Sequence, residues 1–193
     1  MILAKGQTFP SSEQNKLLAN LEVEINETLA KGSLNRETVL SAIDALGKQI
    51  TSGRFDPVIQ LFLQEDAETI HHNIEVAMQF MNSENLRYRL NMEFGADLGE
   101  SQDITPPYGI RKASVCYAPL GTLFHIAAGN MDALPAYTVI EGLLTGNINI
   151  LKLPQADNGL TIEIFKQMIE IEPSSADYIY IFDTPSTDIP AMQ

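Results

Sequence analysis

The spacing of apolar residues divides the chain into two parts of different character. Up to residue 95, apolar side chains recur every three or four positions, which is the period of an amphipathic α-helix. Ser11 and Asn35 precede the first two of these runs and are typical of helix N-caps. We therefore expect residues 1–95 to be mostly helical, with a further helix in "SENLRYRLNMEF". The apolar runs are Leu18, Leu21, Ile25 and Leu29; Val39, Leu40, Ile43, Leu46 and Ile50; and Ile70, Ile74, Ala77, Met78 and Met81.

The second part follows a stretch rich in Gly, Pro and Asp, "GADLGESQDITPPYG". Pro106-Pro107 cannot continue a helix, so residues 96–112 are expected to form a linker. Beyond it, short apolar runs typical of buried strands alternate with runs of helical period. This order predicts an α/β fold, with half of a Rossmann-like parallel sheet (βαβαβ) at residues 113–193. The expected strands are "KASVCYAP", "LFHIAA", "NINILKL" and "DYIYIF", and the expected helices are "DALPAYTVIEGLLTG" and "GLTIEIFKQMIEI".

The charge of the chain argues against nucleic-acid partners. With 12 basic and 25 acidic residues the net charge is −13, which repels phosphate backbones and anionic lipid heads. Residues 113–193 carry Lys152 and Lys166 as their only cations. The N-terminal apolar run is too short for a secretory signal, and no apolar run is long enough to span a membrane. We therefore expect a cytoplasmic protein in which Lys152 is conspicuous.

The cysteine and the histidines suggest no metal site. Cys116 is the only cysteine, so an internal disulfide and a cysteine-based metal cage are both excluded, and we expect it to be a small buried residue of a strand. His71 and His72 are adjacent on a helix and point about 100° apart, which makes a poor chelate. His125 lies in an apolar strand and is expected to be a hydrogen-bonded core residue rather than a base.

A corner with unusually small side chains ends the strand "LFHIAA". Ala127, Ala128, Gly129 and Asn130 fall where a ligand would meet the carboxyl ends of parallel strands. The alternative is purely structural: tight strand–helix packing with an N-cap at Asn130 or Asp132. The dinucleotide fingerprint G-x-G-x-x-G is absent, so an ordinary Rossmann phosphate grip is not indicated. The next strand ends in Lys152, which can donate to ribose hydroxyls or neutralise a phosphate, unless it simply points to solvent.

Together, "PLGTLFHIAAGN" and "GLLTGNINILKLP" resemble the aldehyde dehydrogenase superfamily. Within it, "HIAAGN" is most similar to the acyl-CoA reductase branch, the fatty-acid reductases of bacterial bioluminescence and their relatives. The resemblance is good over residues 119–154 and extends plausibly to the end, whereas residues 1–100 match only in being helical. The chain departs from the family pattern at two positions, because Leu153 stands where proline often follows the lysine and Gly129 replaces an aromatic residue. Both departures leave the details of substrate and cofactor open.

The resemblance implies a role for each residue of the corner. Asn130 would be catalytic, donating its amide to the substrate oxygen in an oxyanion hole. Ala127, Ala128 and Gly129 would line the adenosine side of a cofactor cleft. Lys152 would bind the adenosine ribose, or its 2′-phosphate if the cofactor is NADP rather than NAD. Gln155 replaces a ribose-binding glutamate, which weakens the preference for NAD.

The implied reaction is reduction of an acyl-CoA or another acyl thioester to an aldehyde, through an enzyme cysteine that takes the acyl group. Relatives of this kind are more than twice as long, so we expect an N-terminal part that lacks the nucleophile and is inactive alone. The alternatives are a truncated paralogue that binds nucleotide or dimerises, and a glutamyl-phosphate reductase-like protein. A three-stranded sheet with an uncovered edge is expected to form a homo-oligomer, along that edge or along Ala113–Tyr117.

Overall fold

The computed structural model describes residues 1–53, 56–63, 66–95, 100–109, 111–128, 134–154, 157, 159–185 and 187. Its core is a five-stranded mixed sheet of order β2-β1-β7-β6-β5. The three C-terminal strands, β5 (Thr122–Ile126), β6 (Ile148–Lys152) and β7 (Ile179–Phe182), run parallel to one another. Helices α6 (Leu134–Leu144) and α7 (Leu160–Ile171) connect them, so the expected βαβαβ unit is confirmed.

Two short N-terminal strands extend this sheet beyond the three strands expected. β1 (Ile2–Ala4) pairs antiparallel with β7, and β2 (Gln7–Phe9) pairs with β1. Leu3 lies opposite Ile181, and all three residues of β1 are buried. The expectation of a three-stranded sheet is therefore wrong, because the chain's first residues cover the outer edge of β7.

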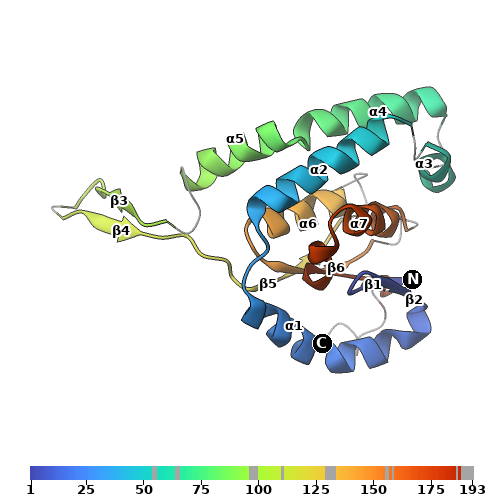
Figure 1. Cartoon of the computed structure of the whole chain (residues 1–193), viewed down its shortest axis with the longest axis horizontal. Helices are drawn as coiled ribbons and strands as arrows, with labels where there is room; N and C mark the ends of the chain where they lie inside the picture. The colour runs from blue at the N-terminus through green and yellow to red at the C-terminus, as the bar shows by residue number, and fades with distance from the viewer. Residues whose placement is uncertain are drawn as a thin grey trace.

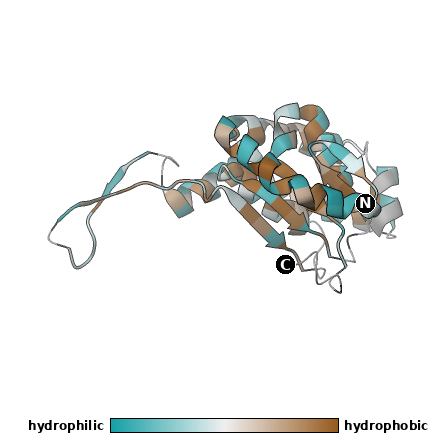
Figure 2. Ribbon diagram, turned by 90° about the horizontal axis from the view of Figure 1, so that it is seen from below, coloured by the Kyte–Doolittle hydropathy of each residue, from teal (hydrophilic) through white to brown (hydrophobic). Residues whose placement is uncertain are grey.

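Helices pack on both faces of the sheet (Figure 1). On one face lie α6 and α7, over which α2 (Arg36–Thr51) packs, and α1 (Gln14–Lys31) lies on the other face. The central strands of the sheet and parts of the helices are rich in hydrophobic residues (Figure 2). Further helices are α3 (Asp56–Leu63), α4 (Ala67–Phe80) and α5 (Ser83–Phe94), with 3-10 turns at Ser11–Glu13 and Pro173–Tyr178.

The N-cap predictions had different outcomes. Asn35 caps α2 as expected, because its side chain accepts hydrogen bonds from the backbone N–H groups of Glu37 and Thr38. Ser11 does not cap α1; it lies in a preceding 3-10 turn and its hydroxyl accepts a hydrogen bond from the N-terminal amine instead. Helix α1 is held by tertiary contacts, among them a hydrogen bond from the hydroxyl of Thr184 to the buried side chain of Gln14.

A two-stranded arm projects from the body (Figures 1 and 2). It consists of β3 (Gln102–Ile104) and β4 (Ala113–Val115), which pair with each other and not with the main sheet. The linker expected at residues 96–112 therefore contains a strand. The strand expected from "KASVCYAP" is three residues long and belongs to the arm, not to the βαβαβ unit.

Candidate functional site

The carboxyl ends of β5 and β6 lie side by side. In the parallel register Ile126 pairs with Lys152, the last residue of each strand. Residues that follow these two strands therefore emerge at the same edge of the sheet, where ligands of open α/β sheets bind. This is the arrangement expected for the corner at residues 127–130 and Lys152. Gly129, Asn130 and Gln155 themselves lie outside the described residues, so their roles stay predictions.

The two alanines of the corner face different surroundings. Ala127 is half-buried and packs against the hydrophobic core, whereas Ala128 is exposed. Neither side chain extends beyond a methyl group, so another molecule can approach the backbone closely after the end of β5.

Lys152 is buried, with 7% of its surface exposed. The alternative of a strand-ending lysine that points to solvent is therefore wrong. Beyond it, the backbone N–H of Leu153 donates to the carbonyl of Phe182, which holds the ends of β6 and β7 together. A buried cation at a sheet edge costs desolvation energy and calls for negative or polar partners.

A carboxylate also lies at this edge. The side chain of Asp157 accepts hydrogen bonds from the backbone N–H groups of Gly159 and Thr161 and from the Thr161 hydroxyl, in front of α7. Burial raises the pKa of Asp157 above its usual value, although these hydrogen bonds act in the opposite direction. The sequence reasoning did not single out Asp157; the signal was an Asp in front of a helical run.

The segments "PLGTLFHIAAGN" and "GLLTGNINILKLP" contact each other at the amino ends of β5 and β6. The backbone N–H of Gly121 donates to the side chain of Asn147 at 3.0 Å, and the N–H of Ile148 donates to the carbonyl of Gly121 at 2.9 Å. Gly146, at φ +81°, lies so close to Pro119 that a Cβ would stand 2.9 Å from its ring. The "PLG" and "TGN" turns therefore fix the register that aligns the strand ends at the corner.

A buried amide orients His125 within β5. The Nε2 atom of His125 lies 2.9 Å from Oδ1 of Asn149, which is fully buried. Since Nδ2 of Asn149 donates to the carbonyl of Asn147, its Oδ1 is the acceptor and His125 carries the Nε2 proton. The expected hydrogen bond of His125 is confirmed, but the residue is half-buried rather than part of the core, since β5 is the last strand in the order of the described sheet. The sequence reasoning missed Asn149, a polar residue inside an otherwise apolar strand.

The remaining candidates lie away from this edge. Cys116 is exposed, and the expectation that it is buried is wrong because β4 ends at Val115 and the arm stands off the core. His71 and His72 are both exposed.

Over the described ranges no cluster of three His, Cys, Asp or Glu side chains could hold a metal ion. No described helix combines the length and the apolar character that crossing a membrane requires.

The family model of the acyl-CoA reductase LuxC matches residues 32–192. The chain belongs to the LuxC family of acyl-CoA reductases. The resemblance to the acyl-CoA reductase branch is thereby confirmed, whereas membership of the aldehyde dehydrogenase superfamily stays a prediction. The LuxC match also includes α2 to α5, which had matched only in being helical. No curated protein matches the chain.

Proposed function

We propose that this chain supplies the cofactor-binding half-sheet of an NAD(P)-dependent acyl-CoA reductase that reduces a fatty acyl thioester to an aldehyde. The observation that carries the proposal is the pairing of Ile126 with Lys152 in a LuxC-family chain. It brings the small-residue corner and a buried cation to one edge of a parallel sheet.

The residues present fit an anionic dinucleotide. The chain carries a net charge of −13, so a phosphorylated ligand needs a local positive charge in order to bind. Lys152 provides a positive charge at this edge of the sheet. Lys152 would donate to the adenosine ribose or to a 2′-phosphate, while Ala127 and Ala128 would allow the adenosine to approach the strand end.

The remaining roles follow from the family. Asn130 would donate its amide to the thioester oxygen and stabilise the negative charge that develops there, a contribution of about 3–4 kcal/mol in comparable sites. Gln155 would lie beside the ribose and tolerate a 2′-phosphate better than a glutamate would. The reduced cofactor supplies a hydride, and a cysteine thiolate is the nucleophile expected for thioester chemistry.

Calorimetry with NADPH and NADH on the whole chain tests the cofactor site. Lys152→Met removes the charge but keeps an apolar side chain of similar length, so the fold should survive. We expect NADPH affinity to fall about tenfold or more, since a hydrogen bond to a charged group contributes about 1.5–3 kcal/mol.

The matched control is Lys166→Met, which removes the other cation of this part of the chain. Lys166 pairs with Glu163 of the same helix, at 2.7 Å, and should not affect cofactor affinity. Equal NADPH affinities for the unmodified chain and folded Lys152→Met would show that the cofactor assignment is wrong.

A further inference from the structure

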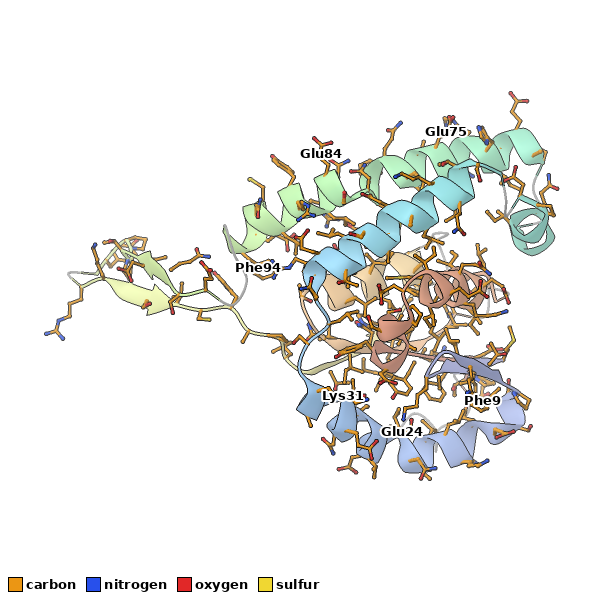
Figure 3. All side chains as sticks on the ribbon, in the orientation of Figure 1. Phe9, Glu24, Lys31, Glu75, Glu84 and Phe94 are labelled. Atoms are coloured by element: carbon orange, nitrogen blue, oxygen red, sulfur yellow. The ribbon has the colours of Figure 1, made fainter. Side chains whose placement is uncertain are left out.

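A groove of about 400 Å³ lies between α5, β5 and α6. Its volume is within the range of small-molecule sites. One wall is formed by the end of α5, where Phe94 is labelled in Figure 3. The groove is lined by apolar side chains from all three elements. These are Leu86, Leu90 and Phe94 of α5, Leu123 of β5 and Leu144 of α6.

The polar side chains at the groove are largely engaged with the protein itself. Arg89 pairs with Glu141 at 2.8 Å and also lies 5.1 Å from the ring centre of Tyr137. The Nε2 atom of His125 is bonded to Asn149. The hydroxyl of Thr145 donates to the carbonyl of Glu141 within its own helix turn. Glu93 also lines the groove, and the leucines together with Phe94 supply the apolar surface available to a ligand.

The groove reaches almost to the end of β5, because His125 lines it and β5 ends at Ile126. Side chains two residues apart share a face of a strand, so Leu123 and His125 point to the same side of β5. The opposite face carries Phe124 and Ile126, which are exposed and do not line the groove.

We propose that this groove binds the distal part of the acyl chain, while the thioester lies at the corner beyond β5. The proposal depends on the proposed function for the identity of the ligand, because the family match indicates an acyl-CoA substrate. An extended hydrocarbon suits an open groove with a leucine-rich wall and paired polar groups. Leu90, near the middle of the α5 wall, is then a determinant of chain-length specificity.

A series of acyl-CoA thioesters on the unmodified chain is the first test. Butanoyl-, octanoyl- and dodecanoyl-CoA are titrated by calorimetry below their micelle concentrations, with CoA itself as the reference. We expect the affinity to rise by up to about fourfold per added methylene, until the groove is filled. Affinities that do not depend on chain length would overturn the proposal.

Substitutions on α5 provide the second test. Leu90→Trp fills the groove and should reduce dodecanoyl-CoA affinity at least tenfold, with butanoyl-CoA affinity unchanged. Met92→Trp is the matched control, because Met92 belongs to the same helix, is 70% exposed and does not line the groove. Circular dichroism establishes that both variants fold. Equal losses in the two variants would contradict a groove site, and the chain-length series decides the question alone if Leu90→Trp does not fold.

The two proposals fail independently. If NADPH binding depends on Lys152 but affinity does not depend on acyl length, the groove assignment is wrong and the cofactor site stands. If long-chain binding depends on Leu90 and NADPH does not bind, the cofactor assignment is wrong and the acyl groove stands.

Discussion

Asn149 is a polar side chain at the centre of the apolar sheet, and its position depends on Gly142. A Cβ on Gly142 would lie 1.7 Å from Oδ1 of Asn149, far inside van der Waals contact. The absent methyl group allows α6 to pack directly on the amide that holds His125. A buried amide is stabilising only while its hydrogen bonds are made, so these three residues form one structural unit.

We therefore expect Gly142→Ala to lower the free energy of unfolding by about 1–3 kcal/mol, the usual cost of overpacking. The added methyl group must displace Asn149, which then loses its bond to His125. Urea denaturation followed by circular dichroism measures the change.

The control for this prediction is the same substitution in an Asn149→Ala background. There the colliding amide is absent, so Gly142→Ala should cost clearly less, and the difference is the coupling energy of the pair. Identical costs in the two backgrounds would show that the contact with Asn149 is not what requires glycine.

At the scale of elements, the start of α7 depends on Asp157. Its carboxylate accepts hydrogen bonds from the N–H groups of Gly159 and Thr161, which would otherwise lack partners at a helix N-terminus. Burial raises the pKa of this carboxyl, so ionising it costs more in the folded chain than in the unfolded chain. Above the ordinary pKa this cost offsets part of the benefit of the cap.

Two substitutions distinguish the contribution of the hydrogen bonds of Asp157 to stability from the contribution of its charge. At neutral pH, Asp157→Ala should lower the unfolding free energy by about 0.5–2 kcal/mol, because all acceptors are lost. Asp157→Asn keeps one acceptor oxygen and removes the charge that burial penalises, so it should cost less than the alanine variant. Thermal or urea unfolding of both variants checks this order, and an asparagine variant no more stable than the alanine variant would contradict it.

The helices and strands with a clear apolar pattern of their own could be predicted from the sequence. The strands at β6 and β7 are nearly continuous apolar runs. Helix α2 has a stripe at helical spacing whose members are buried, except for the half-buried Ile50. β1 and β2 were missed, because three-residue strands carry little periodicity of their own and β1 pairs with residues near the other end of the chain. Cys116 was placed wrongly because an apolar run does not show whether its strand joins the main sheet or an arm.

The site could be predicted only in part, for a similar reason. The alignment of the end of β5 with Lys152 follows from parallel neighbouring strands, and the register confirms it. The burial of Lys152 and the Asn149–Gly142 contact depend on how helices pack against the sheet, which spacing along the chain does not specify. The groove combines residues of α5 with those of β5 and α6, and no motif in any one of these segments indicates it.

Among the described residues, exposed large apolar side chains lie on the arm and on β5, in addition to others on α1, α4 and α5. Ile104, Tyr108 and Tyr117 of the arm region are exposed, and Tyr117 is supported only by an edge-on contact with Phe94 among the ring contacts of the described residues. A two-stranded ribbon has little stability of its own in water. β5 is the last strand in the order of the described sheet and exposes Phe124 and Ile126. Surfaces of this kind are typical of association sites.

We expect the chain to form a homo-oligomer in which the β5 surface is covered. Each copy carries a net charge of −13, so electrostatic repulsion opposes association and salt should weaken that repulsion. Size-exclusion chromatography with light scattering should therefore show a mass that rises with concentration, and more strongly at high salt than at low salt.

The contact surface is identified by adding charge to it. Phe124→Glu combined with Ile126→Glu should shift the chain to the monomer, since four carboxylates would meet across a two-fold contact at β5 without partners. Met92→Glu adds a carboxylate at a site that is 70% exposed on α5 and should leave the oligomer intact. If the oligomer instead dissociates at high salt, attraction between opposite charges holds it together. The contact to test is then one between the exposed Arg111 and Lys112 of the arm and the acidic surface of another copy. A monomer at every concentration and salt would show that the exposed side chains of β5 do not mediate self-association.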